Sequence, residues 1–238
     1  FLKFGVQIFE KAGYEADDLI ATLAEKFKKE KDLRVMILTG DLDTLQMVTD
    51  DKIVVRTFRK GISDTFIYNE AAVFDRYCLK PEQLVDYKAL VGDQSDNIIG
   101  IRGIGEKSAT TLISNFGTLE NIYKKLKKSD EEFLKAGVKA RTLELLKTGE
   151  EEALFSKTLA TIRRDAPIDF KLPEKVWRET FDVKEAEKVF TEYGFKSLFA
   201  RLQILNRGNS DLPNEAHEAK AYSPELKIAS WLLNSEET

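Results

Sequence analysis

Residues 92–109 of the chain read Gly-Asp-Gln-Ser-Asp-Asn-Ile-Ile-Gly-Ile-Arg-Gly-Ile-Gly-Glu-Lys-Ser-Ala. Asp93 and Asp96 are three residues apart, so in a helix or a tight turn both side chains point the same way and can share one cation. The glycines that follow allow the backbone to turn tightly and to approach another molecule with no Cβ in the way. Acidic ligands beside such a turn favour metal-dependent phosphate chemistry.

A helix is predicted directly after the glycines, because apolar residues recur there at helical spacing, at Ala109, Leu112, Ile113 and Phe116. Its N-terminus would present N–H groups and a positive dipole end to an anion. A dinucleotide fingerprint is excluded because a helical pattern, not a strand, comes before the glycines, and a P-loop is excluded because Glu106 stands between glycine and lysine. A helix, a glycine hairpin and a second helix suit a grip on a nucleic-acid backbone. The alternative is an ordinary glycine turn between helices.

Composition limits the chemistry that the 238 residues can perform. The single cysteine, Cys78, excludes an internal disulfide and fits a reducing compartment. The single histidine, His217, lies in a polar stretch, so catalysis by a histidine-activated serine or cysteine and histidine-ligated zinc are both disfavoured. No leader or membrane span is recognised in the sequence, and we expect a cytoplasmic protein.

Charge is distributed unevenly along the chain. The formal net charge is -4, but the segment 102–147 holds an excess of four Lys and Arg over Asp and Glu (ten against six). The glycine hairpin is therefore predicted to lie in a basic region of an acidic protein.

Further acidic residues come before the hairpin. Glu15, Asp17 and Asp18 stand at the start of a predicted helix. The apolar run 35–39 resembles a strand buried on both faces, and Asp41 and Asp43 follow its carboxyl end, where sites form in open α/β sheets. Strands are also expected at 53–58 and 65–68, around a turn at Lys60-Gly61, and at 6–9.

We expect an α/β fold with a mostly parallel central sheet, incomplete at its N-terminal strand, and helices on both faces. A helical helix-hairpin-helix subdomain follows. The expected parts are an α/β part at 1–92, a helical part at 93–207, a linker at 208–224 and a further segment at 225–238.

Seven carboxylates without lysine or arginine partners would repel one another strongly. Divalent cations remove this conflict, and oxygen ligands without histidine or cysteine favour Mg²⁺ or Mn²⁺. Two such ions about 4 Å apart activate a water and stabilise the leaving oxyanion, so no histidine is needed.

Three motifs then resemble the 5'-nuclease (5'-3' exonuclease) domain of bacterial DNA polymerase I, in the flap-endonuclease superfamily. They are Gly13-Tyr-Glu-Ala-Asp-Asp18, Thr39-Gly-Asp-Leu-Asp43 and Gly92-Asp-Gln-Ser-Asp-Asn97 with Gly103-Ile-Gly-Glu-Lys107, and the resemblance covers about residues 1–207. It implies metal-binding and catalytic roles for Glu15, Asp17, Asp18, Asp41, Asp43, Asp93 and Asp96. It also implies that the hairpin grips duplex DNA through Gly100, Arg102, Gly103, Gly105, Lys107 and Ser108, with a monovalent cation such as K⁺ on its carbonyls.

Members of the family begin with a strand that carries a metal-binding aspartate, and they then supply another aspartate and a basic helical arch, which this sequence lacks. The resemblance therefore implies a monomeric DNA 5'-nuclease acting at 5' ends, flaps and nicks in replication and repair, continuous with downstream polymerase domains, with impaired cleavage in this chain. It also implies that 1–92 is a truncated α/β nuclease core (PIN-like), that 93–207 is the helix-hairpin-helix DNA-binding and C-terminal helical part, and that 225–238 is the start of an exonuclease-like domain. The alternatives are a duplex-binding fragment that does not cut and, less favoured, an RNA-cleaving acidic nuclease.

Overall fold

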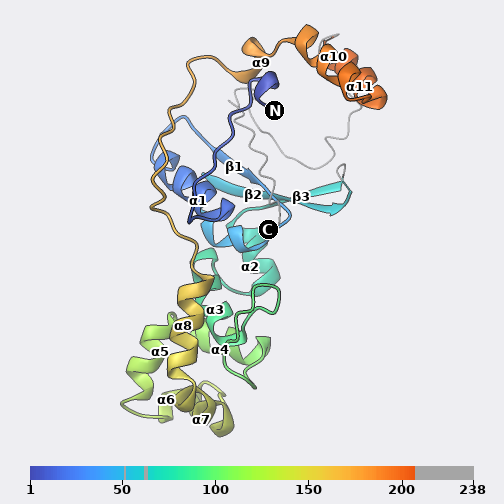
Figure 1. Cartoon of the computed structure of the whole chain (residues 1–238). Helices are drawn as coiled ribbons and strands as arrows, with labels where there is room; N and C mark the ends of the chain where they lie inside the picture. The colour runs from blue at the N-terminus through green and yellow to red at the C-terminus, as the bar shows by residue number, and fades with distance from the viewer. Residues whose placement is uncertain (51, 62–63, 207–238) are drawn as a thin grey trace. The chain divides into compact units, whose positions relative to one another are not determined.

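A computed structural model describes residues 1–50, 52–61 and 64–206 (Figure 1). Two compact units are present. One consists of residues 11–167, and the other combines residues 1–10 with residues from 168 onward. The sequence-predicted boundary near residue 92 falls inside the first unit. The predicted linker at 208–224 and the segment 225–238 lie outside the described residues.

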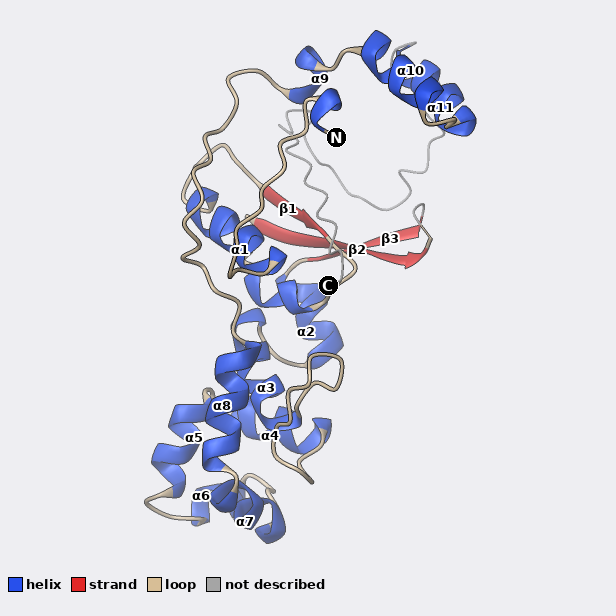
Figure 2. Cartoon of the chain, in the orientation of Figure 1, coloured by secondary structure: helices blue, strands red, loops and turns tan. Residues whose placement is uncertain are grey.

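The first unit begins with α1 (Ala16–Phe27) and a three-stranded sheet in the order β1-β2-β3, with β1 at Val35–Leu38, β2 at Ile53–Lys60 and β3 at Asp64–Tyr68 (Figure 2). The short 3-10 helix η2 (Asp43–Met47) connects β1 to β2. Strand β1 pairs with β2 in parallel, and β2 pairs with β3 antiparallel across the turn at Gly61. The α/β class is confirmed, but the sheet is mixed rather than mostly parallel.

Burial within the sheet differs from the sequence prediction. Strand β1 was expected to be buried on both faces, but Ile37 is its one buried residue and Leu38 is 39% exposed. Strand β2 takes the central place instead. Consecutive side chains of a strand point to opposite faces, and Ile53, Val54 and Val55 are all fully buried. Strand β2 is therefore covered on both faces.

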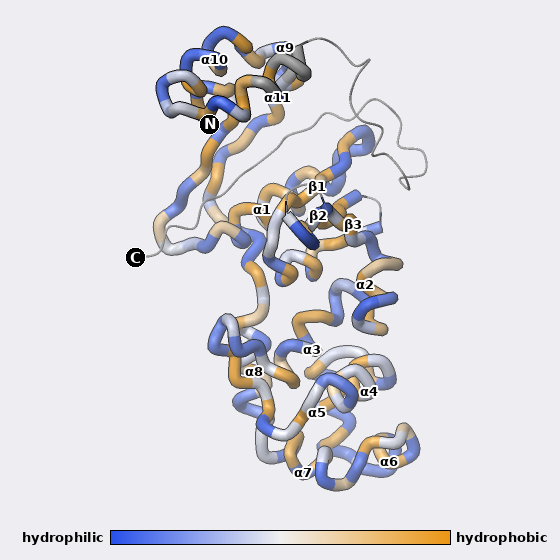
Figure 3. The backbone as a smooth tube through the Cα atoms, turned by 90° about the vertical axis from the view of Figure 1, so that its right-hand side faces the viewer, coloured by the Kyte–Doolittle hydropathy of each residue, from blue (hydrophilic) through white to orange (hydrophobic). Residues whose placement is uncertain are grey.

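Helices make up the rest of the first unit: α2 (Glu70–Tyr77), η3 (Pro81–Gln83), α3 (Leu84–Val91), α4 (Glu106–Phe116), α5 (Leu119–Leu126), α6 (Glu131–Lys135), α7 (Ala140–Thr148) and α8 (Glu150–Ala160). The side chain of Asn69 caps α2 by accepting a hydrogen bond from the N–H of Ala72, as asparagine commonly does at the N-cap position. The four apolar residues predicted for the helix after the glycines are all buried in α4. Hydropathy alternates along these helices, as expected of amphipathic elements (Figure 3).

A network of hydrogen bonds around the buried carboxylate of Asp86 joins three of these helices. Asp86 of α3 is buried, and its Oδ1 accepts hydrogen bonds from Lys157 Nζ of α8 at 2.6 Å and from the N–H of Leu119, at the start of α5, at 3.0 Å. Lys157 also contacts Glu120 at 2.8 Å. This network fixes α8 against the helix that leads into the acidic loop.

The second unit contains η1 (Leu2–Phe4), α9 (Trp177–Thr180), α10 (Val183–Glu192) and α11 (Lys196–Asn206). The indole N–H of Trp177 donates to the carbonyl of Phe4 at 2.6 Å, and the ring of Phe4 lies 5.6 Å from that of Phe190. The strand predicted at 6–9 is wrong, because these residues are not part of the sheet. None of the helices described is long and apolar enough to cross a membrane.

Candidate metal centre and nucleic-acid interface

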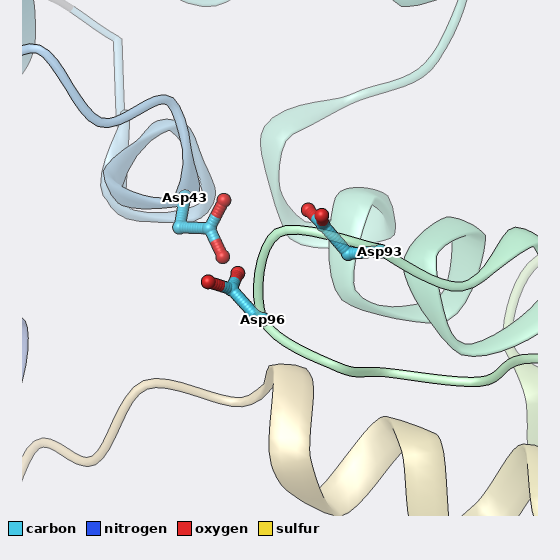
Figure 4. A group of neighbouring side chains, drawn as sticks. All are labelled: Asp43, Asp93 and Asp96. Atoms are coloured by element: carbon cyan, nitrogen blue, oxygen red, sulfur yellow. The ribbon is translucent and has the colours of Figure 1, made fainter.

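Three of the predicted acidic residues converge at one point. Asp43 begins η2, just after β1, while Asp93 and Asp96 lie on the loop that follows α3 (Figure 4). Each residue offers a carboxylate oxygen, and these three oxygens all lie within 4.8 Å of one another. The carboxylates of Asp43 and Asp96 point toward each other. Residues about fifty positions apart in the sequence thus form one acidic cluster.

The loop that carries Asp93 and Asp96 is a closed turn rather than a helix. The backbone N–H and carbonyl of Asp93 are both paired with those of Ile98, each at 2.8 Å. Asp93 Oδ1 accepts hydrogen bonds from the N–H and the hydroxyl of Ser95. Asn97 has φ 56°, a left-handed conformation that asparagine tolerates better than most residues. These bonds hold the Asp93 side chain in one orientation.

A lysine stands inside the cluster, and the prediction that the carboxylates lack basic partners is wrong. Lys88 Nζ donates to Asp93 Oδ2 at 2.8 Å and forms a short contact with Asp43 Oδ1. Burial raises the pKa of Asp93, but hydrogen bonds from Lys88 and Ser95 outweigh it and lower that pKa to about 2. Burial raises the pKa of Asp43 despite Lys88, with help from the charges of Asp41 and Asp96. Lys88 was missed although it lies five residues before Asp93, one helical turn from the end of α3.

Asp17 and Asp41 lie beside this cluster. Burial raises the pKa of Asp17 to about 6, and the negative charges of Asp41, Asp43, Glu15 and Asp18 raise it further. Asp41 is exposed, and its Oδ1 accepts a hydrogen bond from the N–H of Asp43 at 2.9 Å. Asp17, from the first motif, and Asp41 and Asp43, from the second, therefore interact electrostatically.

Glu15 and Asp18 are placed at the N-terminus of α1, with Glu15 as the N-cap residue. Asp18 Oδ2 accepts a hydrogen bond from the N–H of Glu15 at 3.1 Å, and its Oδ1 accepts one from the N–H of Arg163 at 2.9 Å. Both carboxylate oxygens of Asp18 thus accept hydrogen bonds from backbone N–H groups. Asp18 has a structural role in addition to any role in metal binding.

A cavity of about 490 Å³ opens beside the acidic cluster. Its walls include Asp41, Asp43, Lys88 and Asp93, together with the neighbouring rings of Tyr77 and Tyr87. Gln46 also lines it; its amide donates to the carbonyl of Ala160 and its carbonyl accepts from the N–H of Ile162, each at 3.1 Å. Sequence patterns gave no sign of Gln46, because its partners are more than a hundred residues away.

The glycines of the hairpin region divide into two kinds. Gly92 and Gly100 pack against each other: a Cβ added to Gly100 would lie 2.3 Å from the N atom of Gly92, and both have positive φ. Gly100 is buried, and its N–H donates to the hydroxyl of Ser156 at 3.1 Å. The close approach predicted at Gly100 is thus made to the same chain, and its N–H is already committed.

The tip of the hairpin is exposed and basic. Gly103 has φ 94°, Gly105 is the N-cap residue of α4, and the exposed side chains of Arg102 and Lys107 lie on either side of them. Within the described part of the chain, no carboxylate forms an ion pair with Arg102 or Lys107. Ser108, in the first turn of α4, is partly buried. This surface can contact an anion through N–H groups and charged side chains.

The acidic cluster fits a hard divalent cation. Its donors are carboxylate oxygens, which Mg²⁺, Mn²⁺ and Ca²⁺ prefer, and no thiol or imidazole takes part. The residues are only partly buried, since the side chains of Asp43 and Asp93 are 18% and 22% exposed, so water can complete the coordination of an ion.

Comparison with known proteins gives consistent matches. Residues 1–78 match the family model for the 5'-3' exonuclease N-terminal resolvase-like domain, and residues 79–184 match that for the 5'-3' exonuclease C-terminal SAM fold. DNA polymerase I of Bacillus caldotenax is 38% identical over 200 residues, which are 84% of this chain and 22% of that protein. DNA polymerase I of Caldicellulosiruptor bescii is 40% identical over 204 residues, with the same coverage. The chain spans about a fifth of the length of these relatives.

Solved structures of bacteriophage T5 proteins are also similar. T5 5'-exonuclease with bound divalent metal ions (zinc) has a TM-score of 0.54 and 26% identity, over 64% of this chain and 51% of that chain. The T5 D15 flap endonuclease in a pseudo-enzyme-product complex with DNA and metal ions has a TM-score of 0.53 and 25% identity, with the same coverage.

Proposed function

The chain belongs to the 5'-3' exonuclease family, and we propose that it is the metal-dependent 5'-nuclease part of a DNA polymerase I. Its reaction is hydrolysis of phosphodiesters at 5' ends and flaps. The observation that carries this proposal is the convergence of Asp43, Asp93 and Asp96 in the same compact unit as an exposed basic glycine hairpin. One feature supplies ligands for a cation, and the other supplies contacts for a phosphate backbone.

We infer that Asp43, Asp93 and Asp96 hold one divalent ion, Mg²⁺ or Mn²⁺, and that Asp17 and Asp41, with Glu15 and Asp18, serve a second. When bound, such ions polarise a phosphodiester and lower the pKa of water. The residues of the chain orient these ligands. Ser95 fixes the Asp93 carboxylate, and Asp41 receives the N–H of Asp43.

We propose that duplex DNA binds at the tip of the hairpin. Arg102 and Lys107 would contact phosphates, while Gly103, Gly105 and Ser108 would bring the start of α4 close to the backbone. Gly100 supports this surface from inside. A monovalent cation such as K⁺ on the hairpin carbonyls is part of the same proposal.

A second candidate is a duplex-binding fragment that does not cut. The observation in its favour is that a single group of three carboxylates comes within ligand distance of one another among the described residues, whereas two-ion hydrolysis needs more ligands. We further propose a cytoplasmic monomer that is continuous with downstream polymerase domains, in keeping with the polymerase relatives and with the single cysteine.

Cleavage of a 5'-flap DNA with Mg²⁺ or Mn²⁺ tests the nuclease. Asp96→Ala should weaken Mn²⁺ binding because it removes an exposed ligand, whereas Asp75→Ala, on the exposed face of α2, should not. Calorimetric titration measures both. Identical Mn²⁺ affinity in Asp96→Ala and the parent would refute the metal assignment.

Salt-dependent duplex binding tests the interface. Arg102→Ala should weaken binding and reduce the slope of log K against log salt by about 1, because one phosphate contact is lost. Lys29→Ala, exposed after α1, serves as a control. Binding with an unchanged slope in Arg102→Ala would remove this residue from the interface. Salt-sensitive binding without cleavage would favour the second candidate.

A further inference from the structure

Lys88 is placed where a divalent ion would have to bind. Its ammonium contacts one oxygen of Asp43 and one oxygen of Asp93, and the side chains of all three residues are about one-fifth exposed. An ammonium group and a metal ion are attracted to the same oxygens, but two cations in contact with one carboxylate oxygen repel each other. Lys88 and a bound ion therefore compete.

The Asp93 carboxylate makes this competition unavoidable. Its Oδ1 already accepts two hydrogen bonds from Ser95, so Oδ2 is the oxygen that remains for an ion. That oxygen is the one that Lys88 contacts, at 2.8 Å. An ion that binds Asp93 through Oδ2 would share that oxygen with the ammonium, and the repulsion between the two cations favours release of the ammonium.

The fold leaves Lys88 room to move. Its backbone is fixed in the last turn of α3, a helix that packs against α4 and α8. Its side chain has a flexible stem of four methylene groups, and it lines the cavity of about 490 Å³ beside the cluster. The ammonium can therefore swing out while the helix stays in place.

We propose that Lys88 is a tethered counter-cation that holds the carboxylates together in the metal-free protein and that a divalent ion must displace. The inference rests on the proposed metal site and adds a determinant of its affinity. Lys88 stabilises the empty cluster and, for the same reason, weakens metal binding. Asp96 has a different role. The contacts of Lys88 are with Asp43 and Asp93, so Asp96 can bind an ion while the lysine stays in place.

Mn²⁺ titration of the metal-free protein tests this proposal, by calorimetry and by the electron paramagnetic resonance signal of free Mn²⁺. Lys88→Met should bind Mn²⁺ about tenfold to a hundredfold more tightly than the parent, because a positive charge leaves the site. Its unfolding midpoint in EDTA should fall by at least about 3 °C, because the carboxylates lose their counter-ion. Lys88→Arg keeps the charge and should bind no more tightly than the parent.

Lys124→Met, exposed on α5, is the matched control for loss of a lysine charge, and it should leave Mn²⁺ affinity unchanged. Lys88→Gln repeats the test with a polar side chain in case Lys88→Met folds poorly. Equal Mn²⁺ affinity in the parent, Lys88→Met and Lys88→Gln would overturn the role of Lys88 and leave the metal site standing. Failure of every variant to bind Mn²⁺ would overturn the metal site itself, and the inference with it.

Discussion

Replacing Asp17 by Asn should make the metal-free protein more stable at neutral pH. The pKa of this carboxyl is raised from 3.8 to about 6 by burial and by its acidic neighbours. A raised folded-state pKa means that the folded protein holds the proton more tightly than the unfolded chain does. The penalty is therefore absent well below pH 3.8, grows as the pH rises toward 6 and is constant above that.

The raised pKa sets the size of the effect. A tenfold change in proton affinity is worth about 1.4 kcal/mol, so the full penalty is about 3 kcal/mol, and screening by solvent reduces the expected gain to about 1–2 kcal/mol. At pH 4.5 about one-third of the gain should remain, because most of the difference develops between pH 4 and 6. Asn preserves the shape of the side chain and removes the charge.

Urea unfolding followed by circular dichroism in EDTA measures this gain at pH 4.5 and 7.5. Asp75→Asn, on the exposed surface of α2, is the control for loss of an acidic charge. Mn²⁺ should then stabilise the parent more than Asp17→Asn, since the parent has the additional negative charge to neutralise. The reasoning fails if Asp17→Asn is no more stable than the parent at pH 7.5, or if its advantage is equally large at pH 4.5.

Other substitutions test the framework of the site by the same unfolding assay. Gly100→Ala should cost about 3 kcal/mol more than Gly117→Ala. Both positions have positive φ, but a Cβ at Gly100 would collide with the backbone of Gly92, whereas a Cβ at Gly117 meets nothing within 4 Å. Equal losses of stability would show that this collision does not matter. Asp86→Ala should cost about 2–3 kcal/mol, because Lys157 keeps only the exposed Glu120 as a partner and the buried N–H of Leu119 loses its acceptor, and a loss below about 1 kcal/mol would contradict this. Gln46→Ala should cost about 2 kcal/mol through two lost hydrogen bonds, and an unchanged midpoint would show that water replaces them.

Local signals in the sequence predicted much of the fold. The buried positions of α4 follow from a repeat of 3.6 residues, and the cap at Asn69 follows from its side chain. The break between α10 and α11 falls at Gly194, whose φ is 70°, a conformation that glycine adopts without strain. These features depend on neighbours within a few residues.

The errors concern partners that are distant in the sequence. An apolar run such as β1 cannot reveal whether other elements cover both faces of the strand. The chemistry of Asp43 and Asp93 assigned them to one site. Lys88 was not assigned to it, because its contact with Asp43 depends on how α3 packs against η2. Gly100 was assigned to the ligand-facing surface because a glycine permits close approach to any backbone, including that of Gly92.

The segment 160–166, which leaves α8, has a consequence for the order of folding. It closes contacts with α1 and η2, including those of Asp18 with Arg163 and of Gln46 with Ile162, across 145 and 116 residues. Closing such long loops is slow, whereas the hairpin of β2 and β3 and the helices α4–α7 need only local contacts. We therefore expect this segment to dock after the folding transition state, so that weakening it speeds unfolding and leaves the folding rate nearly unchanged. Gln46 lines the cavity beside the carboxylates, and we therefore expect its side chain to be fixed only when this segment docks and to be released first when the segment detaches.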